Sequence, residues 1–226
     1  MVAVPKPAST VVLVDEQLNV FLTKRPKTMK FLGGFYVFPG GGMDEIDTKT
    51  KAKLFTGNLQ DDLINKGYYI AAARELFEEV GILLGETSEG TSKLLTTAQI
   101  DAYREQLLSG DITFANLLES EQLLFNFNSL QYFGQITTPK MSPIRYDTKF
   151  FLAQIPDGQT PHLNHQEVDE AFWLSPEEGL RLYENKELLL APPTIVVMES
   201  LVGLKNGESI ELQNERAEYL AKKMFG

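Results

Sequence analysis

The chain has 226 residues, 43% of them hydrophobic, and a formal net charge of −10 at pH 7. This length can build one well-packed core, so we expect a single domain over residues 1–226, and the acidic balance argues against non-specific binding to nucleic acid or to an anionic membrane. There is no cysteine, no apolar run of membrane-spanning length and no secretion signal in the first residues, so we expect a cytoplasmic protein.

The first predicted elements are a β-hairpin and a basic cluster. Residues 11–14 and 20–23 are rich in β-branched side chains and are separated by a polar turn. Four cations without an intervening acid follow, namely Lys24, Arg25, Lys27 and Lys30. A solvated loop would account for them, whereas their position directly before a glycine turn favours contact with an anionic substrate. Residues 31–38 are aromatic and glycine-rich and predict a strand that ends at Pro39.

Helices are predicted in the next part of the chain. An interrupted apolar pattern within residues 49–65 is typical of one or two short helices. Ala, Arg, Glu and Leu dominate residues 71–80, so we expect a helix that reaches about Leu84, with Gly81 as a plausible earlier stop.

This longer helix has an acidic face. Helical spacing places Glu75, Glu78 and Glu79 together, while small and aliphatic residues on the opposite side can dock on a core. In a cleft with an effective dielectric near 20, each close pair of carboxylates would cost about 4 kcal/mol, and a divalent cation would remove that cost. The alternative is a solvated charged face in which Arg74 pairs with Glu78.

Residues 85–130 predict a mainly helical segment. Thr96 and Gln99 form a capping box for a helix that Gly110 ends, and apolar residues within 112–118 indicate a second helix. Two interpretations stay open: the pair shapes a substrate pocket or a dimer contact, or it simply extends the core.

The last part of the chain predicts strands and then helices. Strands are expected at residues 131–137, 148–155 and 168–174. Ser175 and Pro176, followed by two glutamates, predict the start of a helix, and the pair of prolines at 192–193 is expected to end that region. Residues 194–226 are expected to contain C-terminal helices at 194–204 and 211–224.

Two motifs carry a family resemblance. Residues 38–41 read Phe-Pro-Gly-Gly, and residues 74–82 read Arg-Glu-Leu-Phe-Glu-Glu-Val-Gly-Ile. At both stretches the chain resembles the Nudix hydrolases, whose motif runs from an opening glycine through a first glutamate to Arg-Glu-aliphatic-x-Glu-Glu-x-Gly-aliphatic. The resemblance implies an α/β Nudix fold, a mixed sheet sandwiched between helices. It also implies hydrolysis of a diphosphate that joins a nucleoside to another group.

The chain departs from the family motif in its middle. The family has fewer residues between the opening glycine and the arginine, so residues 43–67 are interpreted as an insertion. Where the motif has its first glutamate, this chain has Lys66. We expect Arg74 to be held by Glu78 together with an acid of the insertion, which can be Asp44, Glu45 or Asp47.

The resemblance also implies roles for individual residues. The metal ligands would be Glu75, Glu78, Glu79 and the backbone carbonyl of Gly40, with Mg²⁺ or Mn²⁺ as the cofactor. Arg74 would orient the carboxylates, and Glu78 and Glu79 are counted with it among the catalytic residues. The general base lies on the motif helix or on a later loop, where Glu167 matches. A surface acid is the alternative interpretation of Glu167.

A second pattern indicates the substrate. Residues 21–41 resemble, in register, a pattern associated with coenzyme A-cleaving Nudix enzymes, and residues 145–176 resemble bacterial relatives of the peroxisomal coenzyme A diphosphatases. Arg25, Lys30 and Gly41 are the substrate-binding residues that this implies. Coenzyme A or an acyl-CoA would be cut to 3′,5′-ADP and 4′-phosphopantetheine.

Two rival functions stay open. One is a diphosphatase for ADP-ribose, NADH or nucleotide sugars, and the other is a non-catalytic module that senses a nucleotide. In each case we expect a small-molecule nucleotide as the ligand, no nucleic acid or membrane partner, and a possible homodimer.

Overall fold

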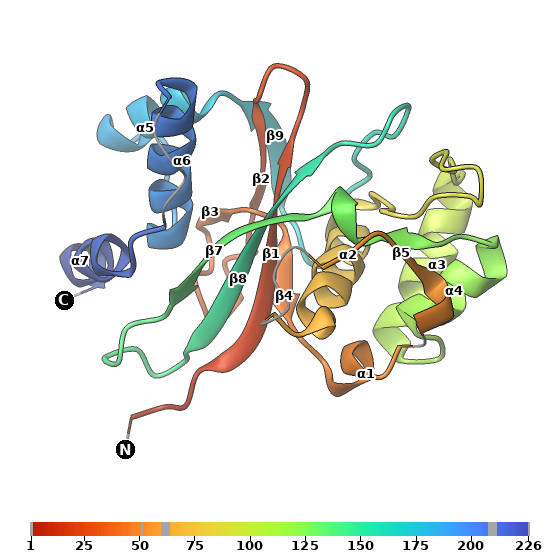
Figure 1. Cartoon of the computed structure of the whole chain (residues 1–226). Coiled ribbons are helices and arrows are strands. Elements are labelled where there is room, and N and C mark those ends of the chain that lie inside the picture. Colours follow the sequence, from red (N-terminus) through yellow and green to blue (C-terminus); the bar gives the residue numbers. More distant parts are fainter. Residues whose placement is uncertain (1, 51, 60–63, 208–211, 226) are drawn as a thin grey trace.

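The computed structural model of the protein describes residues 2–50, 52–59, 64–207 and 212–225. The strands are β1 (Lys6–Val14), β2 (Val20–Lys24), β3 (Tyr36–Val37), β4 (Gly40–Gly42), β5 (Phe55–Thr56), β6 (Phe125–Asn126), β7 (Gln131–Thr137), β8 (Tyr146–Gln154) and β9 (Glu170–Leu174). The helices are α1 (Glu45–Thr48), α2 (Lys66–Val80), α3 (Thr97–Ser109), α4 (Phe114–Glu121), α5 (Pro176–Glu184), α6 (Pro192–Lys205) and α7 (Asn214–Phe225), with 3₁₀ turns η1 (Ala52–Leu54) and η2 (Phe127–Ser129). Figure 1 shows a twisted sheet with α1 to α4 on one side and α5 to α7 on the other.

The sheet is mixed, as expected. Its strand order is β3-β2-β1-β8-β7, with β4 also paired to β1 and β9 to β2. Strand β1 runs parallel to β8 and antiparallel to β2 and β4. The predicted mixed sheet between helical layers is therefore confirmed, and so is the predicted hairpin, in which Val14 pairs with Val20.

Strand β1 is buried on both of its faces. Val11 and Leu13 belong to the core cluster that contains α2, whereas Val12 and Val14 belong to the cluster that contains α6. Successive side chains of a strand point to opposite faces, so a continuous apolar run suits a strand covered on both sides. This arrangement fixes α2 against the middle of the sheet.

Helix α2 has defined ends. The side chain of Asn65 accepts a hydrogen bond from the Gly67 amide over 2.8 Å, and Gly81 ends the helix in the left-handed conformation at φ 70°. The prediction that the helix reaches about Leu84 is wrong, because the left-handed Gly81 turns the chain out of the helical path. The earlier stop at Gly81 is the one that the chain uses.

Other predicted elements differ in their limits. The pair of prolines at 192–193 begins α6 instead of ending a region, since a first helical turn needs no amide donor. Residues 31–34 form turns around a left-handed Gly34, so the predicted strand is reduced to β3. Within the expected insertion, residues 51 and 60–63 lie outside the described part, as does residue 211 of the expected last helix.

Helices expected from local signals are present at those signals. The capping box of Thr96 and Gln99 begins α3, and Gly110 ends it in the left-handed conformation. Ser175 caps α5 by accepting a bond from the amide of Glu178. None of the helices in the described residues is both long and apolar enough to cross a lipid bilayer.

Candidate active site

The acidic face of α2 lies against the glycine turn that leads into β4. The amide of Gly40 donates to Glu79 Oε2 over 3.3 Å. A Cβ atom at Gly41 would lie 2.5 Å from Glu75 Oε2, so a side chain at this position would displace the Glu75 carboxylate. The glycine turn and the helix thus enclose one side of a cavity of about 280 Å³, which Glu75, Glu79 and Glu167 line.

Arg74 is the centre of a buried ion-pair network. Its Nη1 donates to Glu78 Oε2 over 2.8 Å and to Glu75 Oε1 over 2.9 Å. Its Nε and Nη2 donate to the two carboxylate oxygens of Asp47 over 3.2 and 3.1 Å, and Nη2 also donates to the Gly42 carbonyl over 2.8 Å. Arg74 is 7% exposed, and the network fixes the plane of its guanidinium between α1 and α2.

The expected pairing of Arg74 with Glu78 and an acid of the insertion is confirmed. Asp47 is the acid that takes the place of the missing glutamate, and it is only 2% exposed. Asp44 is exposed and approaches Arg74 no closer than 3.7 Å, while Glu45 pairs with Lys49. The bidentate geometry, with two parallel bonds, makes Asp47 the strongest partner of the three.

The carboxylates of α2 have raised pKa values. Burial raises the pKa of Glu75 to about 7 even though Arg74 opposes the rise, and burial does the same to Glu78. Burial, with Glu75 adding to it, raises the pKa of Glu79 well above its usual range. Burial alone would lower the pKa of Arg74, but the surrounding acids raise it beyond its ordinary value. Concentrated negative charge of this kind is stabilised by a cation.

The donor set fits a hard divalent cation. Carboxylate and backbone carbonyl oxygens, supplied here by the three α2 glutamates and Gly40, are the ligands that Mg²⁺ and Mn²⁺ prefer. Among the described residues no three acidic or histidine side chains form a preassembled metal cluster. Arg74 donates to Glu75 and Glu78, and Glu79 accepts from the Gly40 amide.

Glu167 lies in a loop that is fastened to the end of α2. The amide of His162 donates to the Val80 carbonyl over 2.8 Å, and the amide of Asn164 donates to the Glu79 carbonyl over 2.9 Å. Burial raises the pKa of Glu167, against the influence of Arg104. Glu167 is half-buried and lines the cavity together with Glu75 and Glu79.

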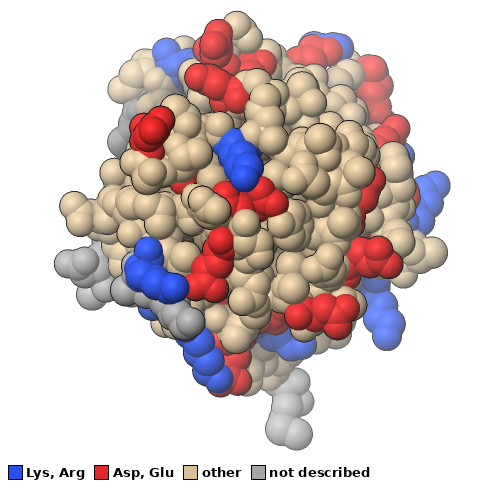
Figure 2. Space-filling model, turned by 90° about the vertical axis from the view of Figure 1, so that its right-hand side faces the viewer, with Lys and Arg blue, Asp and Glu red and all other residues tan. Residues whose placement is uncertain are grey.

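The basic cluster divides between two places. Arg25 lines the cavity of the glutamates, and its Nε donates to the Phe31 carbonyl over 3.1 Å. Lys30 is exposed and lines a neighbouring cavity, and Lys24 pairs with Glu170 over 2.7 Å. Figure 2 shows acidic and basic side chains interspersed over the face on the α3 side, without a broad positive surface on that face.

Sequence reasoning missed Arg104. This α3 residue is 5% exposed, and its Nη2 donates to the His162 carbonyl over 2.7 Å. In the sequence it is one charged residue on a polar helix, and only its position inside the apolar spacing from Ile100 to Leu107 could have indicated burial. It connects the helical segment of residues 85–130 to the loop of Glu167.

Comparison with known proteins places the chain in a family. A family model described as the NUDT19 Nudix domain matches residues 50–201. Putative nudix hydrolase 7 of Caenorhabditis elegans is 29% identical over 211 residues, which cover 90% of this chain and 62% of that protein. The acyl-coenzyme A diphosphatase NUDT19 of Gallus gallus is 30% identical over 144 residues, covering 56% of this chain and 38% of that protein. The chain thus spans less than two thirds of these curated relatives.

A solved structure supports the same assignment. The crystal structure of a NUDIX hydrolase from Alicyclobacillus acidocaldarius matches with a TM-score of 0.80 and 29% identity, covering 92% of this chain and 99% of that one. Nudix hydrolases generally use divalent metal ions. Together with the glutamate face of α2, these findings show that the chain belongs to the Nudix family and contains a NUDT19-type Nudix domain.

Proposed function

We propose that the chain is a Mg²⁺- or Mn²⁺-dependent diphosphatase that cuts coenzyme A or an acyl-CoA to 3′,5′-ADP and 4′-phosphopantetheine. The observation that carries this proposal is the cavity in which Glu75, Glu79 and Glu167 meet beside Arg25. A site that brings three carboxylates and one arginine together suits a cation and a phosphorylated ligand at once.

In this proposal the three α2 glutamates and the Gly40 carbonyl hold the cation. When bound, the cation would lower the pKa of the attacking water and offset charge on the phosphoryl oxygens. Arg74 keeps Glu75 and Glu78 in place through its bonds of 2.9 and 2.8 Å. The role of the guanidinium is therefore to position the carboxylates.

Hydrolysis requires a water to add to one phosphorus while the bridging P–O bond breaks. The water gives one proton to a carboxylate, and the leaving phosphate takes the electron pair of the broken bond. Glu167 suits the base, because burial raises the pKa of its carboxyl and so increases its affinity for a proton. Glu79 is the second candidate, since its carboxylate lines the same cavity.

Coenzyme A is favoured over other nucleoside diphosphates by two lines of support. The NUDT19 proteins of Gallus gallus and Xenopus laevis are named acyl-coenzyme A diphosphatases. The basic cluster also supplies Arg25 beside the glutamates and Lys30 next to the cavity, and coenzyme A carries a 3′-phosphate that ADP-ribose and NADH lack. A sensing module is disfavoured because every acid of the second half of the motif is retained.

A substrate panel tests the proposal. Coenzyme A, acetyl-CoA, ADP-ribose and NADH are incubated with the protein and either Mg²⁺ or Mn²⁺, and the products are separated by chromatography. We expect 3′,5′-ADP and 4′-phosphopantetheine from coenzyme A, and none after chelation of the metal. Faster cleavage of ADP-ribose or NADH would support the rival diphosphatase, and binding without cleavage of any substrate would support the sensing module.

Two further expectations are kept as proposals. A homodimer is tested by light scattering coupled to size-exclusion chromatography, and a cytoplasmic location by imaging of the tagged protein in its cells.

A further inference from the structure

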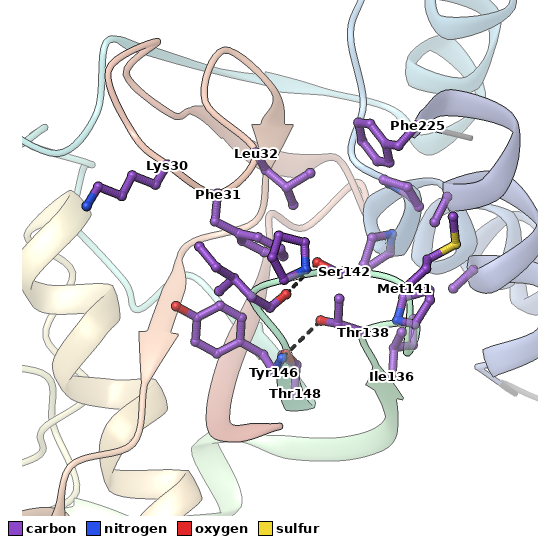
Figure 3. A pocket seen from close by; sticks show the side chains of 17 residues that line it. Lys30, Phe31, Leu32, Ile136, Thr138, Met141, Ser142, Tyr146, Thr148 and Phe225 are labelled. Carbon is purple, nitrogen blue, oxygen red and sulfur yellow. Dashed lines mark hydrogen bonds between the residues drawn. The ribbon is translucent and has the colours of Figure 1, made fainter. Parts of the chain in front are cut away.

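A second cavity, of about 410 Å³, adjoins the cavity of the glutamates. Its walls come from residues 30–32, from the β7–β8 connection and from the start of α6 together with α7 (Figure 3). The two cavities share Phe31, Leu32, Tyr146, Thr148 and Pro193 as lining residues. We call it the α7 cavity, because α7 closes the side remote from the glutamates.

The walls of the α7 cavity are apolar in their chemistry. Most of the lining side chains are aliphatic, aromatic or proline, and of the hydroxyls Ser142 Oγ donates to the Ile144 carbonyl over 2.6 Å while Thr138 Oγ1 accepts from the Tyr146 amide over 3.0 Å. Figure 3 shows Lys30 extending to the side away from α7. A group rich in hydroxyls or ring nitrogens would lose its water partners here without full replacement.

The position of the cavity limits which part of a substrate can reach it. The rings of Phe31 and Tyr146 pack edge to face at 5.2 Å between their centroids, and both residues line both cavities. A group that enters the α7 cavity must therefore be attached close to the diphosphate held by the glutamate cavity. The size of the cavity is within the range of small-molecule sites.

We propose that the α7 cavity binds the branched aliphatic group that follows the diphosphate in the pantetheine arm of coenzyme A. This inference rests on the proposed function and adds a source of selectivity to it. In ADP-ribose and nucleotide sugars the same place is taken by a sugar, whose hydroxyls would face mainly apolar side chains on these walls. The cavity therefore selects diphosphates that carry an aliphatic ester over those that carry a sugar.

Helix α7 offers a matched pair of variants. Ala221 lines the α7 cavity and is half-buried, so Ala221→Phe fills the space from the wall opposite the glutamates. Ala221→Leu fills less of it and serves as a milder version. Ala102 lies exposed on α3 and lines none of the cavities described, so Ala102→Phe controls for adding an aromatic ring to a helix.

Calorimetry separates the two halves of the substrate without depending on turnover. Binding of 4′-phosphopantetheine and of 3′,5′-ADP is measured in Mg²⁺ for wild type and variants, and circular dichroism checks that each variant is folded. We expect Ala221→Phe to weaken the binding of 4′-phosphopantetheine at least tenfold, and Ala221→Leu to weaken this binding less. The affinity for 3′,5′-ADP should change less than twofold, and Ala102→Phe should match wild type.

Three results would overturn the inference. Equal affinities in wild type and Ala221→Phe would show that the cavity is not used. A loss confined to 3′,5′-ADP would place the adenosine part there, and an equal loss for both ligands would indicate a general distortion. Failure of the proposed function would appear separately. In that case wild type would bind 4′-phosphopantetheine and Ala221→Phe would weaken this binding, but wild type would not cleave coenzyme A.

Discussion

Arg74 and Asp47 form a buried, two-bond ion pair across 27 positions of sequence, with distances of 3.2 and 3.1 Å. The pair joins α2 to the short helix α1 and completes the support of the glutamates. An acid from the insertion thereby occupies the role that the family motif gives to a glutamate on the approach to the helix.

Asp47→Ala should destabilise the protein by about 3 kcal/mol, because it leaves a buried guanidinium short of one of its partners. Turnover should fall as well, since Arg74 then positions Glu75 and Glu78 less firmly. Urea unfolding and steady-state kinetics measure both effects. Asp44→Ala is the control, because Asp44 is exposed and 3.7 Å from Arg74; equal effects of the two variants would contradict the assignment.

Glu79→Gln should remove most of the turnover and leave the fold intact. The substitution keeps the shape of the side chain and removes one of the negative charges that would hold the cation. Without metal, the variant should be slightly more stable than wild type, because the repulsion between the carboxylates of residues 79 and 75 is gone. Glu105→Gln on the exposed surface of α3 is the control, and wild-type turnover of Glu79→Gln would show that the metal site is assigned incorrectly.

The metal-free protein should lose stability as the pH rises from about 5 to 8. The pKa values of Glu75 and Glu78 are raised from 4.5 to about 7 in the folded state, so the folded protein binds protons more tightly than the unfolded chain. Each carboxyl contributes up to about 3 kcal/mol to the free energy of unfolding. This contribution is fully present below pH 4.5 and is lost as the pH rises through 7. Urea unfolding across this range measures it.

Two comparisons sharpen this pH test. Glu78→Gln removes one titrating group and should flatten the pH dependence, and saturating Mg²⁺ should flatten it further by favouring the charged carboxylates. A stability that rises between pH 5 and 8 in the metal-free wild type would contradict the raised pKa values.

Arg25→Ala should erase most of a preference for coenzyme A over its 3′-dephospho form. A charge-assisted hydrogen bond to a phosphate corresponds to about tenfold or more in kcat/KM. Lys30→Ala is the parallel variant at the exposed position. Equal rates of wild type on both substrates would show that the 3′-phosphate is not recognised and would support a general diphosphatase.

Arg104→Met should lower kcat with little change in KM, because Arg104 holds the His162 carbonyl and thereby the loop of Glu167. Its charge also opposes the rise of the Glu167 pKa, so the acidic limb of the pH–rate profile should move to higher pH. Arg104→Lys should keep part of the wild-type kcat and should move the acidic limb less than Arg104→Met does. An unchanged pH profile in a folded Arg104→Met variant would reduce Arg104 to a purely structural residue.

Features encoded by neighbouring residues were predictable from the sequence. The hairpin that pairs Val14 with Val20, the capping box of α3 and the acidic face of α2 each depend on residues within a few positions of one another. The pair of prolines at 192–193 misled the prediction, because proline both ends and begins helices. In the structure the amide of Ala191, the residue before these prolines, donates to the Tyr36 carbonyl of β3 over 3.1 Å, which ties the start of α6 to the sheet.

Features that depend on distant residues were not predictable in the same way. From the sequence, three acids of the insertion were equally possible partners of Arg74. In the structure the buried one, Asp47, is the partner. Nothing in the sequence indicated that Arg104 meets His162, 58 positions later, or that α7 closes a cavity against residues 30–32. Such contacts are set by how helices dock on the sheet, and a periodic pattern in one segment does not contain that information.

The parallel pairing of β1 with β8 has a consequence for synthesis on the ribosome. One edge of β1 is covered by β2 and β4, which are translated almost at once, whereas on its other edge Lys6 meets Tyr146, 140 positions later. A nascent chain must therefore carry an open, apolar strand edge until β8 has left the exit tunnel. Long-range closure of this kind slows folding and exposes the chain to aggregation, so production of this protein should respond to slower translation and to chaperones.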